Sequence, residues 1–244
     1  MLYYNEFDPF AAEWLRELMK AGLIPHGEID TRSITEVKPD DIRHYTQCHF
    51  FAGIGGWSEA LRLAGWEPSR PVWTGSCPCQ PFSSAGNQKG KSDERHLWPV
   101  WYNLIRECRP ATIFGEQVSS AIAHGWLDDV YKGLEAEGYA CGAAVLPACS
   151  VGKPHRRNRL FFVAHAEREG FSSRLIERTE PPAIFVAENC GEIIGRKEWG
   201  ERNGEPELSI VVDGLPTIVG GSVGYGNAIV PQVAAEFIGA FMER

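Results

Sequence analysis

A short apolar run at residues 48–52 leads directly into the turn Gly53-Ile54-Gly55-Gly56, and a helical pattern begins immediately after it. Glycines end a strand and turn the chain sharply, and they let a ligand approach the N–H groups of the following helix. The sequence therefore predicts a strand, a tight turn and a helix, which together form the first half of a βαβ unit. A tight turn without a ligand also fits this pattern.

Further apolar runs and helical patterns continue the alternation. The runs lie at residues 71–74, 111–114, 141–146 and 160–164, and the helical patterns lie at residues 97–108 and 126–137. Strands that alternate with helices are typical of a mostly parallel sheet with helices on both faces. The predicted fold class is therefore α/β.

The alternation is absent from two parts of the chain. Residues 1–46 are predicted to be an N-terminal helix followed by an acidic connector with at most one short strand. Residues 47–166 form the predicted core, and residues 167–212 are predicted to be a small variable module. Residues 213–244 return to the core with a final helix.

Composition and charge limit the partners that the chain can have. A length of 244 residues, with 43% hydrophobic residues, is enough for one good core. The start of the sequence does not resemble a secretory signal and no apolar stretch is long enough to span a bilayer, so we expect a cytoplasmic protein without a membrane partner. The net charge of −8 leaves room only for a local nucleic-acid surface. Residues 152–178 are such a region, with seven Lys or Arg against three Glu.

A proline-rich segment with two cysteines, Cys77-Pro78-Cys79-Gln80, follows the apolar run at residues 71–74. Ligands gather at the carboxyl ends of the strands in open parallel sheets, so a cysteine on this rigid loop can be aimed at a substrate. Two inert thiols in a turn are the alternative. The remaining cysteines form no second close pair, so the sequence predicts no metal site, and most of its seven cysteines are expected to be free thiols.

An acid and two arginines stand at comparable positions. Glu116 follows the apolar run at residues 111–114, and Arg157 and Arg159 lie two residues apart on an extended segment, where their side chains share a face. Such a carboxylate can protonate or hydrogen-bond a ring nitrogen, and the two guanidinium groups can address one anionic or carbonyl group. Individually, these residues also fit a helix N-terminal charge and a solvated basic turn.

In this order, the segments FAGIGG, PCQPFS, GEQV, PHRRNR and GNAIVP resemble the cytosine-5 DNA methyltransferase family, in particular its short phage-type members. The resemblance covers about residues 48–166 and 213–241. It implies a shortened Rossmann-like fold that depends on S-adenosylmethionine and methylates C5 of a flipped-out cytosine through a covalent cysteine adduct. A cytosine-5 methyltransferase that acts on tRNA and a non-catalytic DNA-binding protein of the same fold remain alternatives.

The resemblance also implies roles for individual residues. Cys79 would be the nucleophile beside Gln80, Glu116 would contact the cytosine at N3 and its exocyclic amine, and Arg157 and Arg159 would face the base and the cysteine loop. The residues that would hold S-adenosylmethionine are Phe51, Ala52, Gly53, Ile54, Gly55, Gly56, Trp57, Pro78, Asn227 and Ala228. DNA is the expected partner, and the candidates for contact with it are Ser83, Ser84, Lys89, Arg168 and Arg174. A protein partner or a second copy of the chain would supply further DNA affinity.

The chain departs from the family pattern in single residues and in length. His49 stands where an acidic residue usually precedes the glycine turn, Gln117 where Asn is usual and His155 where Gln is usual. Only 22 residues lie between the glycine turn and the second cysteine of the proline-rich loop, too few for the two strands that normally carry the ribose and adenine contacts. We expect the N-terminal segment to replace these strands and to place a carboxylate from residues 27–30 or 39–42 near the cofactor. A solvated acidic linker is the alternative.

Overall fold

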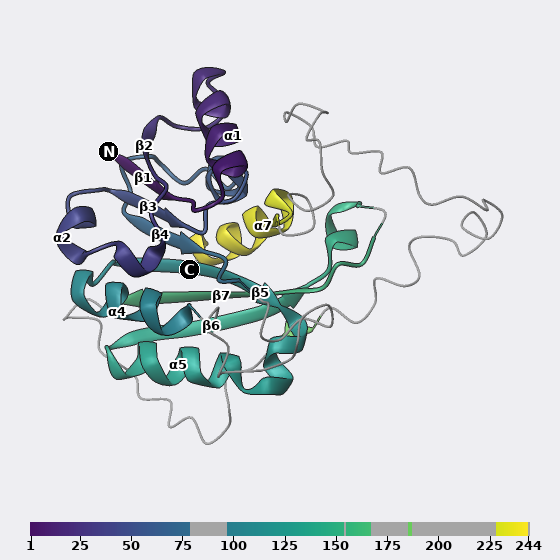
Figure 1. Cartoon of the computed structure of the whole chain (residues 1–244). Helices are drawn as coiled ribbons and strands as arrows, with labels where there is room; N and C mark the ends of the chain where they lie inside the picture. Colours follow the sequence, from purple (N-terminus) through teal and green to yellow (C-terminus); the bar gives the residue numbers. More distant parts are fainter. Residues whose placement is uncertain (79–96, 154, 167–184, 187–227, 244) are drawn as a thin grey trace.

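A mostly parallel sheet forms the centre of the computed structural model, which describes residues 1–78, 97–153, 155–166, 185–186 and 228–243 (Figure 1). The sheet has eight strands in the order β2-β1-β3-β4-β5-β7-β6-β8. Their bounds are β1 (Leu2–Asn5), β2 (Gly27–Asp30), β3 (Gln47–Phe50), β4 (Val72–Gly75), β5 (Thr112–Val118), β6 (Tyr139–Leu146), β7 (Arg159–Ala166) and β8 (Phe185–Val186). Only β7 is antiparallel to its neighbours, β5 and β6.

Helices cover both faces of this sheet. One face carries α1 (Pro9–Lys20), α3 (Gly56–Leu63) and α7 (Pro231–Met242), and the other carries α2 (Pro39–Ile42), α4 (Trp98–Cys108) and α5 (Trp126–Ala136) (Figure 1). Short 3-10 helices lie at η1 (Ile34–Glu36), η3 (Ser119–His124) and η4 (Ala148–Val151). The α/β prediction of a mostly parallel sheet with helices on both faces is confirmed. None of the helices in the described ranges is long and apolar enough to cross a membrane.

Alternate residues of a strand pack against opposite helical layers. Phe114 and Phe161 pack with α3 and α7, whereas their sequence neighbours Ile113 and Phe162 pack with α4 and α5. This is the two-residue period of a strand buried on both faces. Such strands read as continuous apolar runs, which is why the sequence located β4, β6 and β7 to within about two residues, and the start of β5 to within one, although β5 continues four residues beyond its predicted run.

The N-terminal segment differs from its prediction as a helix and connector. The helix is present as α1, but the residues on both sides of it form β1 and β2, which join the main sheet. β1 pairs in parallel with both β2 and β3, so a boundary at residue 46 is wrong and residues 1–46 belong to the core. Four-residue strands give little periodicity, so β1 was not recognised, whereas β2 lies in the connector, where the sequence allowed one short strand. The expectation that this segment replaces the missing strands stays a prediction, and β1 and β2 lie beside β3 as it requires.

The predicted module at residues 167–212 lies outside the described residues, apart from the short strand β8. This strand runs parallel to β6 at the edge of the sheet. The predicted return of residues 213–244 to the core is described from residue 228, where α7 packs against α3.

A buried polar cluster joins β1, β3, β4 and α3 beneath the glycine turn. The Nδ1 atom of His49 lies 2.7 Å from Thr74 Oγ1 and its Nε2 atom lies 3.4 Å from Ser58 Oγ, which also lies 3.0 Å from the Tyr4 hydroxyl. Burial lowers the pKa of His49 to about 3. The imidazole is therefore neutral and takes the place of the acid usual at this position.

We expect this histidine to make the protein less stable as the pH falls from 7 to 5. The folded state resists protonation of His49, whereas the unfolded chain takes up a proton near its ordinary pKa of 6.5, so stability is lost below that pH. The loss of unfolding free energy attributable to His49 at pH 5 is about 2 kcal/mol. Urea unfolding at the two pH values should show a smaller loss in His49→Gln, and the native loss in a control at an exposed histidine, His26→Gln. Equal losses in the native protein and His49→Gln would contradict this assignment.

Candidate active site

The predicted motifs meet at one edge of the sheet because their strands are parallel neighbours. The glycine turn follows β3, the Cys77-Pro78 segment follows β4, and Glu116 lies on β5 directly after the paired residues Gly75 and Gly115. Cys79 and Gln80 lie outside the described residues, as do Asn227, Ser83, Ser84, Lys89, Arg168 and Arg174. The structure thus describes the start of the cysteine loop and the groups on either side of it.

The glycine turn is held from two directions. Phe51, Gly53 and Gly55 have φ angles of +52°, +56° and +84°, and the αL conformation at Gly55 places it as the N-cap of α3. A Cβ atom on Gly56 would lie 2.8 Å from the side chain of Ile229, so only glycine lets the segment before α7 approach this closely. Two segments predicted to hold the cofactor are thereby brought together.

Glu6 is a residue of this edge that the sequence analysis missed. It follows β1, the strand beside β3, and its carboxylate accepts hydrogen bonds from the backbone N–H groups of Gly53, at 2.6 Å, and Asp8, at 2.8 Å. Burial raises the pKa of Glu6, against the lowering effect of these two bonds. An acid directly after the strand next to the glycine turn is a recognisable signal, but only once β1 is known to be a strand.

Two of the acids expected near the cofactor, Asp30 and Asp41, form hydrogen bonds with the side chain of Arg32. Asp30 ends β2 and accepts hydrogen bonds from the Tyr3 hydroxyl, at 2.8 Å, and from the backbone and guanidinium of Arg32. Burial would raise the pKa of Asp30, but these bonds outweigh it and lower the pKa. Asp41 bonds to the same guanidinium at 3.0 Å. Both carboxylates stabilise the N-terminal segment, and Glu6 is the acid bonded to the glycine turn.

Glu116 is the buried acid of the site. Its Oε1 atom lies 2.9 Å from Nε of Arg159, and only 8% of the Glu116 side chain is exposed. Burial raises the pKa of Glu116, although Arg159, Arg157 and a hydrogen bond from Ser76 act in the opposite direction. A carboxyl group with a raised pKa and a fixed orientation can exchange a proton with a base that enters the site.

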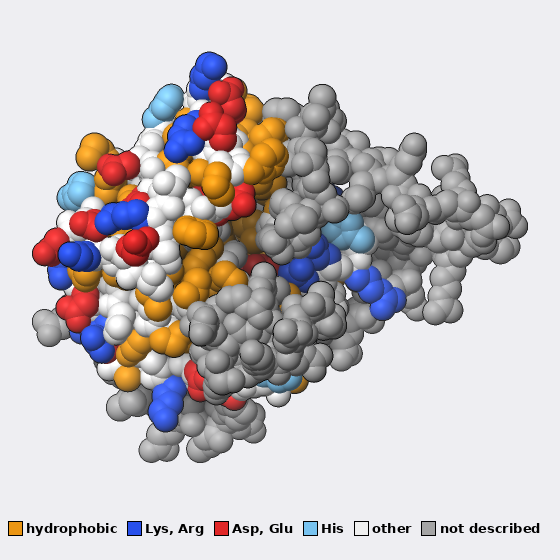
Figure 2. All heavy atoms as spheres, in the orientation of Figure 1, with side chains coloured by type: hydrophobic (Ala, Val, Ile, Leu, Met, Phe, Trp, Pro, Cys, Tyr) orange, Lys and Arg blue, Asp and Glu red, His pale blue; other side chains and the backbone are white. Residues whose placement is uncertain are grey.

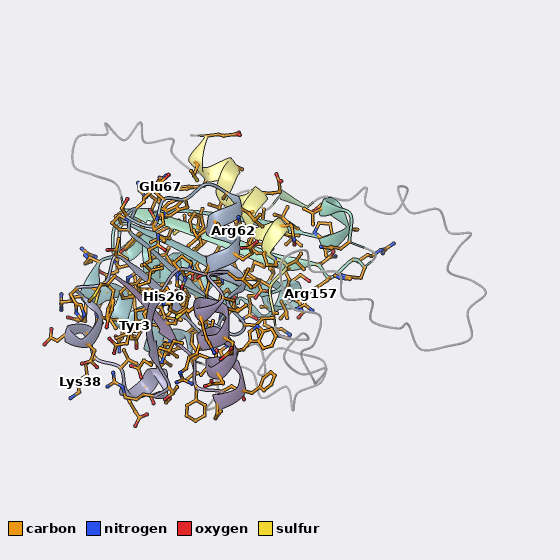
Figure 3. All side chains as sticks on the ribbon, turned by 90° about the horizontal axis from the view of Figure 1, so that it is seen from above. Tyr3, His26, Lys38, Arg62, Glu67 and Arg157 are labelled. Atoms are coloured by element: carbon orange, nitrogen blue, oxygen red, sulfur yellow. The ribbon has the colours of Figure 1, made fainter. Side chains whose placement is uncertain are left out.

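Arg157 connects two of the predicted motifs. Its guanidinium donates a hydrogen bond to the backbone carbonyl of Ala228 at 2.6 Å, and its φ angle is +35°. Figure 3 shows Arg157 close to the start of α7 and far from Lys38, which lies beside the N-terminal strands. A non-glycine residue at positive φ is strained, and such strain persists where surrounding contacts hold the residue in place.

Gln117 on β5 and Cys77 after β4 meet at the start of the cysteine loop. Gln117 donates from Nε2 to the carbonyl of Cys77 at 3.4 Å, so the residue that replaces the usual Asn anchors the start of the loop. The Cys77 side chain is buried, and burial raises the pKa of its thiol. A neutral buried thiol is a poor nucleophile, which leaves the second cysteine of the loop as the candidate.

A basic surface lies beside these groups. His155 and Arg156 are exposed and Lys153 is partly exposed, and Figure 2 shows basic side chains and a histidine together on this side of the molecule. Burial, followed by the charges of Arg157 and Lys153, lowers the pKa of His155. The described part of the predicted basic region is therefore accessible to an anionic partner.

Comparison with known proteins agrees with the resemblance found in the sequence. Residues 68–177 match the family model of the C-5 cytosine-specific DNA methylases. The match covers less than half of the chain, and it includes the start of the cysteine loop, Glu116, Arg157 and Arg159.

Relatives with assigned activities share part of the chain. The Type II methyltransferase M.AluI of Cellulosimicrobium cellulans is 32% identical over 158 residues, which are 59% of this chain and 29% of that protein. The Type II methyltransferase M.NaeI of Lentzea aerocolonigenes is 31% identical over 157 residues, which are 63% of this chain and 37% of that protein. A solved structure of a Spodoptera frugiperda DNMT2 mutant has a TM-score of 0.48 and 15% identity, and covers 75% of this chain and 46% of that chain. The chain thus spans less than half the length of each of these proteins.

The ion pair at Glu116 should make a large contribution to stability. Arg159→Gln leaves a buried acid without its cation, so the pKa of Glu116 rises further and the folded state loses about 3 kcal/mol where the acid is ionised in the native protein. The deficit should shrink as the pH falls and Glu116 takes up a proton. Urea unfolding at pH 8 and pH 5 measures both effects. Arg109→Gln breaks an ion pair in which the Arg109 side chain is 56% exposed, and should cost less than about 1 kcal/mol at either pH. Equal losses for the two variants would show that burial does not strengthen the Glu116 pair.

Proposed function

We propose that this chain is a DNA cytosine-5 methyltransferase that uses S-adenosylmethionine. The observation that carries the proposal is the buried Glu116, paired with Arg159 on the strand next to the one that leads into the cysteine loop. Cytosine C5 is too weak a nucleophile to accept a methyl group unaided, so the reaction needs a nucleophile and an acid on opposite sides of one flipped-out ring. The match of residues 68–177 to the family model of the C-5 cytosine-specific DNA methylases supports the same choice.

The proposed roles follow from the chemistry of each residue. The Cys79 thiolate forms a bond to C6 while Glu116 donates a hydrogen bond or a proton to N3, and the ring electrons are displaced toward C5. After methyl transfer, loss of the C5 proton to a base and expulsion of the thiolate restore the aromatic ring. Arg159 holds Glu116 in place, and Arg157 holds the segment before α7.

The groups around the glycine turn fit S-adenosylmethionine, which when bound supplies an electrophilic methyl group on a sulfonium. The half-buried Glu6 carboxylate has the chemistry to accept hydrogen bonds from the two ribose hydroxyls. The turn at residues 53–56 and the segment Asn227-Ala228 would line the rest of the pocket, together with Phe51, Ala52, Trp57 and Pro78. We propose a cytoplasmic location in a bacterium or a phage-infected host, where DNA and S-adenosylmethionine are both present.

DNA affinity is proposed to depend on the basic region rather than on the whole surface. Lys153, His155 and Arg156 are the described members of that region, and the candidate contacts Arg168 and Arg174 follow them in sequence. Since phosphate neutralisation dominates such affinity, a chain with a net charge of −8 should bind duplex DNA weakly. A protein partner or a second copy would supply the remainder.

A covalent-trapping experiment tests the reaction. DNA that contains 5-fluorocytosine should form a denaturant-resistant adduct with the native protein in the presence of S-adenosylmethionine, because fluorine at C5 blocks the final elimination. Cys79→Ala should form no adduct, whereas Cys77→Ala, at the buried thiol, should retain it. If Cys77→Ala alone loses the adduct, the nucleophile is Cys77, and the assignment to Cys79 is wrong. Trapping on tRNA, but not on duplex DNA, would support the RNA alternative.

A binding experiment tests the role of Glu6. Glu6→Gln should weaken S-adenosylmethionine binding about 10- to 100-fold in calorimetry, the range expected for loss of a charge-assisted hydrogen bond. Glu17→Gln, at an exposed position on α1, serves as the control and should bind as the native protein does. If Asp30→Asn weakens binding while Glu6→Gln does not, the cofactor acid lies on β2 and not after β1.

A further inference from the structure

Two paired glycines determine which way the next residues of β4 and β5 point. Gly75 lies opposite Gly115 in the parallel pair. Where a Cβ atom would be, each glycine meets an aromatic ring of the α4 and α5 layer: Trp101 at 2.6 Å for Gly75 and Phe162 at 2.0 Å for Gly115. Because successive residues of a strand point to opposite faces, Ser76 and Glu116 both point toward the α3 layer.

Helix α3 places a hydrogen-bond donor on that face. Trp57, the second residue of α3, donates its indole N–H to Ser76 Oγ at 3.0 Å. Its ring lies parallel to Phe114, with centroids 6.4 Å apart, and Phe114 shares a face of β5 with Glu116. The aromatic packing fixes the indole, so the position of Ser76 Oγ is fixed as well.

The Ser76 hydroxyl can serve both neighbours at once. A serine hydroxyl has one donor hydrogen and two acceptor lone pairs, and the bond from Trp57 uses a lone pair. The hydrogen remains for an acceptor, and the Glu116 carboxylate is the adjacent one across the strand pair. A hydrogen bond between these side chains lowers the pKa of Glu116.

We propose that Ser76 is a positioning residue for Glu116, and that the chain of hydrogen bonds from Trp57 through Ser76 to the carboxylate links the helix of the glycine turn to the buried acid. Arg159 holds one side of the carboxylate and Ser76 holds the other. Among the residues that the structure describes, the charged and titratable groups that face Glu116 are Arg159 on β7, Arg157 before β7 and Cys77 after β4. The catalytic meaning of this contact rests on the proposed function, but the contact itself does not.

The test follows Glu116 in the full chain without cofactor or DNA. Carbon-detected NMR of the side-chain carboxyl gives its pKa in the native protein, Ser76→Ala and Ser76→Thr. Ser76→Ala should raise the pKa by about half to one pH unit, the effect expected for one lost hydrogen bond to the ionised form. Ser76→Thr keeps the hydroxyl and should stay near the native value. An unchanged or lowered pKa in Ser76→Ala overturns the proposal, as does an equal rise in Ser76→Thr.

The indole N–H resonance of Trp57 provides an independent readout. It should move upfield in Ser76→Ala because the indole loses its acceptor. Trp66 is the matched control, since its indole donates to the backbone carbonyl of Arg70 at 3.1 Å and is untouched by the substitution. Movement of both resonances would indicate a general structural change and would overturn the specific link.

Single-turnover methylation of duplex DNA separates this proposal from the proposed function. The apparent pKa of Glu116 in the pH profile of the methylation rate should rise in Ser76→Ala by the same amount as the pKa measured by NMR. In Ser76→Thr it should stay near the native value. If the native protein transfers no methyl group while the titration still shifts, the proposed function fails and the positioning role stands. If methylation proceeds with an unshifted pH profile, the positioning role fails and the function stands.

Discussion

The parallel pairing of β1 with β3 is the interaction on which the rest of the site depends. β1 lies between β2 and β3, and all four of its residues are buried. Its end delivers Glu6 to the glycine turn, where the Gly53 N–H and the carboxylate lie 2.6 Å apart. Without this pairing, β3 would become an edge strand and the glycine turn would lose its hydrogen bond to Glu6.

The strand order bears on the short interval after the glycine turn. β1 and β2 precede the turn in the chain and lie beside β3 in the sheet, where they would replace the two strands that the family resemblance leads us to expect after the turn. A sheet depends on which strands are neighbours, and neighbours can be connected in more than one chain order. The sequence reveals this through a shortage of residues, which predicts that strands are missing but not which acid accompanies their replacements.

The parts of the fold that were predictable are those with strong periodicity. β4 to β7 are continuous apolar runs and α4 and α5 have clear helical faces, so both types of element were recognised. The four-residue strand β1 was missed because its pattern is too short, and Glu6 was missed with it, whereas β2 lies where the sequence allowed one short strand. Glu116, Arg157 and Arg159 were identified from their order along the chain. The bonds from Gln117 to Cys77 and from Trp57 to Ser76 join residues 40 and 19 positions apart, which only the folded chain brings together.

The contact of Ile229 with Gly56 has a consequence for biosynthesis. The glycine turn is translated early, but Ile229, which packs against Gly56, lies just before α7 and is translated late. The Arg157 guanidinium also bonds to this late segment, at the carbonyl of Ala228. Domains fold during synthesis as their parts leave the ribosome, so the glycine turn emerges long before Ile229 is available to pack against it. A nascent chain can therefore assemble most of the sheet before Ile229 covers Gly56, and this contact forms only when the helix at residues 231–242 has docked.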